Sequence, residues 1–589
     1  MKYQILLNIL DQIRREATPS HHSRYLPTEL DVEKINAARA RAFIHLYLKV
    51  YFGVLNFEDR ERLITDGSYD GGIDGYYIHE ETKQIYLIQS KFRTTEANFE
   101  NKSIDLTEIL QMDVNRILDG EQFDEQGNEY RGKIKQLQRE ISQLTDIARY
   151  TYKVVLLANV KDISPAKLRM LTGGYGVEIF DFQKSYEKLI FPVITGTYFT
   201  ASDISIPIDL SSKNAGAKIG YTVKTKISDC EITVLFAPAI ELAKIMHKYK
   251  NSILKYNPRS YLDLEGKAVN NAIRDTILNS STNEFALYNN GITMLSDETF
   301  INERIGKKNK AQLRVKNPQI INGGQTSYTL SRIFAERTES EAESVFKEKE
   351  VLLKIITLID NNSHENKLQL IDEISNATNK QTPVINADKF ANETIHQDLQ
   401  KRIFDKFGLL YERKRGEFSD GVSNKYVNAT QIIERNLFLR LLYVSDGQLQ
   451  KGIQKRLFQK NEFSDLNLDD PLLFDRFYLS FRVFSELTRE LIEKKRVITS
   501  GIYVQVFTYV RAFFQEGIYP EPDKIQENLK KISAKWAAFI QLQKNQIGPW
   551  HKKKVDRSTG NEKYRFREAK YYQSLQFARD IELFFNPAS

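Results

Sequence analysis

The chain has 589 residues, of which 41% are hydrophobic and 28% are charged; its 85 Lys and Arg residues exceed its 77 Asp and Glu residues by a net charge of +8. Such a composition predicts a globular protein of about three to five domains and excludes a collagen, a coiled-coil rod and a small disulfide-stapled scaffold. No run approaches the ~20 apolar residues of a membrane span, so we expect no membrane partner.

The cysteine and histidine content bounds the location and the kind of metal site. The single cysteine, Cys230, cannot form an internal disulfide, which favours a reducing, cytoplasmic location. The eight histidines are scattered and show no paired metal-ligand spacing. Any metal would therefore have to be held by oxygen ligands, and the modest positive charge permits a nucleic-acid partner without requiring one.

The first third of the chain predicts helices followed by a mixed sheet. Residues 1–60 read as amphipathic helices, with a helix entry near Pro27. Beyond them, YYIHE and QIYLIQSKF predict two strands joined by a short hairpin turn, and YKVVLLANV and VEIFDF predict two buried strands. Helical patterns at 105–118 and 131–149, and a helix capped by Ser164 and Pro165, lie between the strands. We expect a restriction-endonuclease-like mixed sheet flanked by helices over residues 1–195.

The rest of the chain predicts an α/β region and then an all-α region. In the middle domain, residues 200–420, the predicted strands are KIGYTVKTKI, EITVLFA, FALYNNGITML, QLRV and VLLKIITLI, with helices between them. Leu, Phe and Tyr recur at helical spacing over residues 425–589, which predicts a helical domain with an aromatic core. Its segment 541–575 carries nine Lys or Arg residues and interleaved aromatics, typical either of a solvated surface or of a phosphate-contacting patch.

One group of residues near the predicted hairpin suits phosphodiester hydrolysis. Asp74 comes directly before the first strand, and Gln89 and Lys91 lie two apart near the end of the second, so they project together. A carboxylate from Asp74, the amide oxygen of Gln89 and the carbonyl of Ser90 are ligands suited to Mg²⁺. Lys91 could then orient the attacking water or stabilise charge on the phosphate. The structural alternative is an ordinary Asp-Gly turn beside a solvated lysine.

These residues resemble the PD-(D/E)xK nuclease superfamily, specifically its Mrr-like branch, through Gly-Ile-Asp ending at Asp74 and Gln-x-Lys ending at Lys91. The resemblance implies a Mg²⁺-dependent endonuclease, with Mn²⁺ as a substitute metal. Such nucleases usually carry a glutamate on the helix before the first core strand. We expect Glu33 to fill that catalytic position, with Asp66 and Asp70 as alternatives in the loop.

The middle region contains several Asn- and Gly-rich motifs. YNNGIT, INGGQTS, SNATNKQ and NPR combine two-way hydrogen-bonding amides with glycines that let backbone N–H groups approach a ligand. INGGQTSYTLSRIF also predicts a strand, a glycine turn and a helix N-terminus, which suits a phosphate but equally a plain turn and cap. The candidate ligand or nucleic-acid contacts are Asn289, Asn290, Asn322, Gly323, Gln325, Thr326, Asn379, Gln381, Arg259, Arg413 and Arg415.

The order of these motifs, followed by YERKRG, resembles the AIPR family, named for abortive infection and phage resistance, over roughly residues 220–420. A weaker similarity of INGGQT to turn motifs of ParB-like domains leaves a nucleotide or a phage-derived trigger open. His364 and His396 read as ordinary surface or capping residues.

Together the two resemblances imply an endonuclease that cuts phage or foreign duplex DNA. Since cutting both strands needs two active sites, we expect a homodimer. Two alternatives stay open: a catalytically inactive nuclease fold that senses or regulates, and an RNA-cleaving nuclease that arrests the host.

Overall fold

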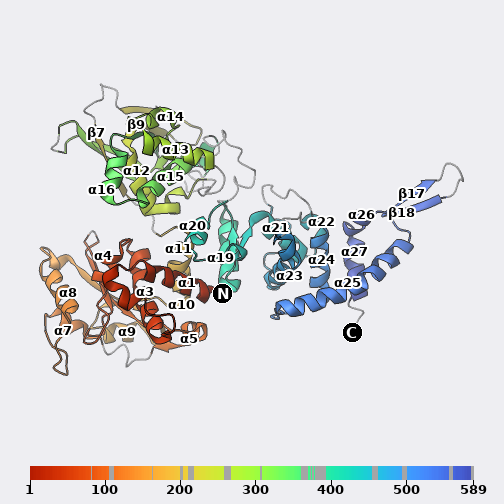
Figure 1. Cartoon of the computed structure of the whole chain (residues 1–589), viewed down its shortest axis with the longest axis horizontal. Helices are drawn as coiled ribbons and strands as arrows, with labels where there is room; N and C mark the ends of the chain where they lie inside the picture. Colours follow the sequence, from red (N-terminus) through yellow and green to blue (C-terminus); the bar gives the residue numbers. More distant parts are fainter. Residues whose placement is uncertain are drawn as a thin grey trace. The chain divides into compact units, whose positions relative to one another are not determined.

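The computed structural model forms two compact units: residues 1–383 with 414–431, and residues 384–413 with 432–589 (Figure 1). The residues described are 1–589 without 81, 105–111, 162, 199–202, 210–217, 228, 258–266, 281, 306–307, 360–368, 372, 375–376, 378–392, 454–461, 494–499, 556–561 and 586–589. Across these described residues, no helix is both long and apolar enough to cross a membrane.

The chain begins with helices, as the sequence predicts. They are α1 (Lys2–Arg15), the 3₁₀ turn η1 (Pro19–His21), α2 (His22–Tyr25), α3 (Val32–Tyr51) and α4 (Phe57–Arg62). Most apolar residues of α1 and α3 are buried, and the two helices pack on each other. α3 starts later than the expected entry at Pro27, because the Asp31 side chain caps it by accepting a hydrogen bond from the Lys34 N–H.

A four-stranded mixed sheet follows, in the order β1-β2-β4-β6. Its strands are β1 (Gly75–His79), β2 (Gln84–Ser90), β4 (Thr151–Leu157) and β6 (Gly176–Ile179). β1 and β2 form the predicted antiparallel hairpin, whereas β4 runs parallel to β2 and β6 parallel to β4. β6 was expected to be buried on both faces, but all four of its residues are only half-buried, since it is the edge strand.

Short helices and strands connect this sheet. They are α5 (Glu96–Asn101), β3 (Ser103–Ile104), α7 (Val114–Leu118), α8 (Gly132–Ser142), η2 (Ile147–Arg149), β5 (Asn159–Val160), α9 (Pro165–Leu171), α10 (Phe182–Ser185), the π-helix η3 (Tyr186–Ile190) and α11 (Phe191–Thr195). Ser164 caps α9 as predicted. α8 ends at Ser142 and not at 149, because the chain turns through η2 to enter β4.

The middle region has a five-stranded sheet in the order β13-β10-β14-β9-β8 and a three-stranded sheet in the order β11-β12-β7. The strands are β7 (Asp203–Asp209), β8 (Lys218–Val223), β9 (Cys230–Pro238), β10 (Ile292–Ser296), β11 (Glu298–Asn302), β12 (Lys310–Lys316), β13 (Gln319–Asn322) and β14 (Glu350–Leu358). The expectation included no strand at β7 or β11. It also made 285–295 one strand, whereas the chain forms the short helix α14 (Phe285–Tyr288) before β10.

Helices of the middle region pack with its sheets: α12 (Ala239–Tyr249), η4 (Lys250–Leu254), α13 (Lys267–Asn279), α15 (Gly324–Ala335) and α16 (Glu339–Phe346). The first unit also contains α20 (Ser419–Ser423), which packs on α11, and η5 (Ala429–Gln431). The expected passage from strand through glycine turn to helix is confirmed: β13 leads through Gly323 into α15.

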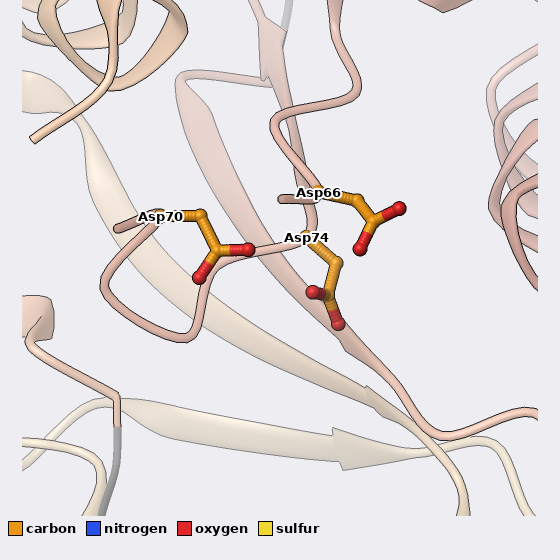
Figure 2. A group of neighbouring side chains, drawn as sticks. All are labelled: Asp66, Asp70 and Asp74. Carbon is orange, nitrogen blue, oxygen red and sulfur yellow. The ribbon is translucent and has the colours of Figure 1, made fainter. Parts of the chain in front are cut away.

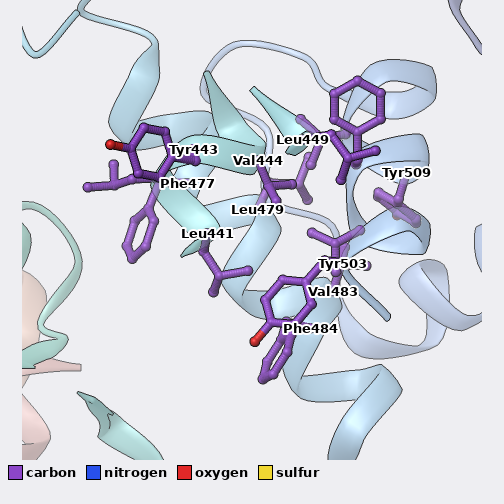
Figure 3. Close-up of a cluster of buried hydrophobic side chains, with 14 of the residues drawn as sticks. Leu441, Tyr443, Val444, Leu449, Phe477, Leu479, Val483, Phe484, Tyr503 and Tyr509 are labelled. Carbon is purple, nitrogen blue, oxygen red and sulfur yellow. The ribbon is translucent and has the colours of Figure 1, made fainter. Parts of the chain in front are cut away.

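The second unit is helical, as predicted, with two small strand pairs added. Its helices are α19 (Thr394–Phe407), α21 (Arg435–Ser445), α22 (Leu449–Gly452), α23 (Leu473–Glu493), α24 (Ser500–Phe513), α25 (Pro522–Asn545), α26 (Glu568–Tyr572) and α27 (Leu575–Phe585). Its strands are β15 (Leu410–Glu412), parallel to β16 (Ile432–Glu434), and β17 (His551–Val555), antiparallel to β18 (Glu562–Phe566). The predicted aromatic core is confirmed by the buried cluster in Figure 3, which includes Phe477, Tyr503 and Tyr509.

The glycine turn before α15 yields a stability prediction. Gly323 has φ +83°, and a Cβ added there would lie 2.8 Å from the Gly291 carbonyl oxygen. We expect Gly323→Ala to destabilise the middle region by roughly 1–3 kcal/mol, because it adds a left-handed strain to a steric clash. Gly220→Ala is the control, since an added Cβ there meets no described atom within 4 Å. Hydrogen exchange of peptides spanning 319–335 measures the difference; equal protection in both variants would contradict it.

Candidate functional site

Asp74 is held at the mouth of the β1–β2 hairpin by three backbone hydrogen bonds. Its N–H donates to the Ile88 carbonyl at 2.8 Å, and its carbonyl accepts from the N–H groups of Thr65 at 3.0 Å and Asp66 at 3.1 Å. Its carboxylate accepts a hydrogen bond from the Ser90 N–H at 2.6 Å. The hairpin therefore fixes both the backbone and the side chain of Asp74.

Two further carboxyl groups lie beside Asp74. One oxygen each from Asp66, Asp70 and Asp74 lies within 4.8 Å of the other two, and Figure 2 shows all three side chains extending from the loop that enters β1. Asp70 is oriented by N–H groups of the same loop, those of Gly67 and Gly72, each at 2.9 Å. The two loop aspartates that the sequence offered as alternatives thus form one cluster with Asp74.

The cluster makes the ionised form of Asp74 unfavourable. Burial of its carboxyl group raises the pKa of Asp74 to about 8; the Ser90 N–H lowers it, the charges of Asp66 and Asp70 raise it, and the ammonium of Lys91 lowers it. Burial likewise raises the pKa of Asp70, with a smaller opposing effect from its two N–H donors. A nearby cation would reverse both effects.

A buried guanidinium anchors the loop from behind. Arg41, on α3, is 5% exposed. It donates to the Asp66 carbonyl at 3.0 Å, to the Asp66 carboxylate at 3.1 Å, to the Glu61 carboxylate at 2.9 Å and to the Tyr25 hydroxyl at 2.8 Å. Because a buried Arg must find acceptors for its donors, these bonds tie the Asp66 end of the loop to α3 and α4.

Glu61 is the buried glutamate nearest this loop, but its carboxylate faces the ion network and not the aspartate cluster. It pairs with Arg41, accepts from the Tyr25 hydroxyl and lies 3.2 Å from His45 Nε2. These partners hold the pKa of Glu61 well below its usual range even though burial opposes them. Burial also lowers the pKa of His45, to about 4, so its ring is neutral at neutral pH. The sequence did not predict this network; its signal was that Arg41 and His45 border the apolar run of residues 42–44 in the same helix.

The remaining predicted nuclease residues lie on and after β2. Gln89 is buried. Gly75 pairs with Ile88 in the antiparallel hairpin, so one position further along the register places Gln89 opposite Asp74. Lys91 follows the strand, and its N–H donates to the Leu157 carbonyl at 3.1 Å. Glu33 is placed elsewhere: it is exposed in the first turn of α3 and is not part of the cluster that the described carboxylates form.

The Asn- and Gly-rich motifs of the middle region largely hydrogen-bond to one another. Asn289 Nδ2 donates to the Thr326 hydroxyl at 3.1 Å, and its Oδ1 accepts from the Gly291 N–H at 2.9 Å. Asn322 Oδ1 accepts from the Gly323 N–H at 2.7 Å, and Gln325 Nε2 donates to Asn270 at 2.9 Å. The Asn289–Thr326 bond joins the turn before β10 to α15, and the Gln325–Asn270 bond joins α15 to α13, while Asn290 is exposed.

The other candidate contacts divide between described and undescribed residues. Arg259, Asn379, Gln381 and His364 lie outside the described residues. Arg413 and Arg415 flank Lys414, which sequence reading missed: it is 4% exposed and donates to the carbonyls of Lys255 at 2.6 Å and Asn257 at 3.0 Å.

The expectation for His396 was wrong. It is fully buried, with Nδ1 at 2.7 Å from the Tyr411 hydroxyl and Nε2 at 3.0 Å from Arg435. The neighbouring residues in the sequence are polar, which suggested a surface position. His396 instead lies on the buried face of α19, which packs into the core of the second unit.

The raised pKa of Asp74 predicts a pH-dependent local stability. Because the folded pKa lies above the unfolded value of about 4, the carboxyl group stabilises the hairpin most at low pH, and this contribution is lost as the pH rises to about 8. With chelator present, rate-corrected hydrogen exchange of peptides spanning 72–90 should show protection that falls over this range. Asp74→Asn should flatten the profile, and an unchanged slope in that variant would contradict the assignment.

Comparisons with known proteins agree with the motif order. The family model described as AIPR protein matches residues 254–553, just over half of the chain. The match begins after the aspartate cluster, extends past the motif region and reaches into β17 of the second unit. Neither the curated proteins nor the solved structures yielded a match. The chain belongs to the AIPR protein family, whose name, abortive infection and phage resistance, suggests a role in defence against phage.

Proposed function

We propose that this AIPR protein is a Mg²⁺-dependent endonuclease that hydrolyses phosphodiester bonds of phage or foreign DNA. The observation that carries the proposal is the convergence of Asp66, Asp70 and Asp74 at the end of a hairpin whose second strand leads into Lys91. This is the grouping of carboxylates and a lysine that an Mrr-like PD-(D/E)xK nuclease domain would need.

The donor set fits a hard divalent cation. Asp66, Asp70 and Asp74 offer only oxygen, which Mg²⁺ prefers, and Mn²⁺ would accept the same ligands. The three oxygens lie within 4.8 Å of one another, whereas adjacent ligands of an octahedral Mg²⁺ shell are about 3 Å apart and opposite ligands about 4.2 Å, so the carboxylates would move closer together on binding. The amide oxygen of Gln89 and the carbonyl of Ser90 remain predicted ligands of the Mg²⁺ ion. A bound cation would polarise the phosphate and lower the pKa of a water molecule.

The protein's own groups then have separate roles. The Ser90 N–H holds one oxygen of Asp74 in place, so this carboxylate is oriented before substrate arrives. Arg41 fixes Asp66 at the opposite side of the cluster. Lys91 carries the positive charge that would stabilise the phosphate as water bonds to phosphorus and the bond to the leaving oxygen breaks.

One observation favours the inactive alternative. Arg41 already pairs with the Asp66 carboxylate, which reduces the negative charge available to a cation. A nuclease fold that only binds DNA would keep this pairing without cleaving. The two functions differ in a cleavage assay.

The first test is cleavage of supercoiled plasmid and phage DNA with Mg²⁺. We expect Asp74→Asn, Asp70→Asn and Lys91→Met each to lower the rate about a hundredfold or more, since each removes a group that acts on the metal or the phosphate. Asp66→Asn should lower it too, whereas Glu33→Gln should not. If Asp66→Asn kept full activity and Glu33→Gln lost it, Glu33 and not Asp66 would occupy the catalytic position, as the sequence originally predicted.

The matched control is Asp59→Asn, which removes an exposed carboxylate on α4 with no ion pair within the described part of the chain. It should cleave like the wild type. Cleavage unaffected at Asp74 and Lys91 would contradict the proposed site. No cleavage of any DNA would favour the inactive sensor, and cleavage confined to RNA would favour the host-arrest nuclease.

Metal binding gives a readout that does not depend on activity. We expect Mg²⁺ or Mn²⁺ to stabilise the wild-type protein by about 2.7 kcal/mol at 100 times its dissociation constant, through preferential binding to the folded state. Thermal unfolding followed by circular dichroism measures this gain. Asp74→Asn should lose it and Asp59→Asn should keep it; equal stabilisation of all three proteins would place the cation elsewhere.

A further inference from the structure

The β17–β18 hairpin in the second unit carries an unfavourable arrangement of charge. Lys552 on β17 lies directly opposite Arg565 on β18, and both side chains are exposed. Like charges on directly opposed strand positions repel each other. Within the described part of the chain, neither side chain forms an ion pair with a carboxylate. These two opposed positive charges therefore have no ion-pair partner within the described part of the chain.

The backbone register extends this pattern along the ribbon. Two positions further along the ladder, Lys554 pairs with Lys563, so these alternate register positions hold basic residues on both strands. The pair between them joins Lys553 with Tyr564. A five-residue strand is about 16 Å long, which spans several phosphates of a nucleic-acid backbone.

The root of the hairpin is packed and oriented. The Phe566 and Tyr571 rings pack in a tilted arrangement with centroids 5.5 Å apart, and the Trp550 ring lies 5.0 Å from the Tyr571 ring. The ring of His551 accepts from the Gly548 N–H at 3.1 Å through Nδ1 and lies 3.2 Å from the Lys544 carbonyl through Nε2. The hairpin is thus fixed to α25 and α26 at its base.

Beyond this root the ribbon projects away from the helices that carry it (Figure 1). Tyr571, at the base, is fully buried, whereas Lys552, Lys553 and Arg565 are exposed. The charged positions are therefore presented to solvent by a rigid base, which suits a partner with a regular array of negative charge.

We propose that the β17–β18 hairpin is a DNA-binding ribbon that contacts the phosphate backbone of duplex DNA. The major groove is about 12 Å wide and admits a two-stranded β-ribbon, whose basic positions can then reach phosphates. The inference rests on DNA being the substrate proposed above, and it names a second surface, apart from the aspartate cluster, that holds this substrate.

The experiment measures binding of a fluorescent mixed-sequence DNA duplex by anisotropy, with chelator present so that no cleavage occurs. The variant Lys552→Gln/Arg565→Gln should bind at least about fivefold more weakly. The slope of log K against log salt should fall by about 1.8, since each lost phosphate contact removes ~0.9. The control, Lys530→Gln/Lys535→Gln, removes two exposed lysines of α25 and should bind like the wild type.

A charge reversal separates binding from stability. Arg565→Glu places a carboxylate opposite Lys552, so hydrogen-exchange protection of the hairpin should increase while DNA affinity decreases. If the basic pair were merely a surface feature, protection would increase with no change in affinity. Unchanged Trp fluorescence would confirm that the root around Trp550 remains folded.

The remaining outcomes distinguish a failure of the nuclease proposal from a failure of the DNA-binding ribbon proposal. Reduced binding and salt slope without any cleavage by the wild type would support the ribbon and contradict the nuclease. Cleavage lost in Asp74→Asn, with DNA binding unchanged in both hairpin variants, would overturn the ribbon alone. A variant effect seen only with duplex RNA, or only with vesicles of phosphatidylserine and phosphatidylcholine, would overturn DNA as the occupant.

Discussion

The buried guanidinium of Arg41 is the constraint on which the candidate site depends. It lies in α3 with 5% exposure and joins Glu61 of α4 to Asp66 of the loop that enters β1. The Arg41–Glu61 pair is buried, and removing one partner of such a pair typically costs about 3–5 kcal/mol, because the other charge is left without compensation. The Asp66 side chain is 44% exposed, so its pair with Arg41 contributes less. The helices therefore hold one end of the loop, and the hairpin holds the other through Asp74.

This clamp explains how three carboxyl groups can remain close together. Burial and the repulsion between the carboxylates favour the protonated form of Asp74, which raises its pKa to about 8. A loop free to relax would separate the charges, but the hydrogen bonds from Arg41, Ser90 and the loop N–H groups prevent it. In the account proposed here, a divalent cation relieves the repulsion, so the same electrostatics that destabilise the empty cluster favour metal binding.

The local patterns of the sequence were sufficient to predict the hairpin and its residues. Alternating apolar positions identified β1 and β2, and the two-residue period placed Gln89 and Lys91 on one face. The placement of Asp66 and Asp70 beside Asp74 depends on long-range contacts with Arg41 and on left-handed glycines at 71 and 72, so the sequence left them as alternatives to Glu33. Short strands such as β11 were missed because five residues carry too little periodicity.

Other misses have the same origin in tertiary contacts. His396 looked polar in sequence, yet Tyr411 and Arg435 satisfy both ring nitrogens and allow its burial. Lys414 lies in a basic run of the sequence, which gave no sign that it is buried. In the structure its ammonium group donates hydrogen bonds to two backbone carbonyls. The AIPR motifs, by contrast, were readable as a family signature. Their hydrogen bonds show why: they build one strand–turn–helix corner that needs those amides and glycines.

The most direct test of the central claim is the anomalous scattering of Mn²⁺ in crystals of the full chain. We expect an anomalous difference peak within about 2.0–2.4 Å of carboxylate oxygens from Asp74 and at least one of Asp66 and Asp70, and no such peak in Asp74→Asn. Two results would contradict the proposed metal site. One is a wild-type protein that cleaves DNA with Mn²⁺ while the ion binds at other residues. The other is an Asp74→Asn protein that cleaves DNA with Mn²⁺ while the ion still binds at this loop.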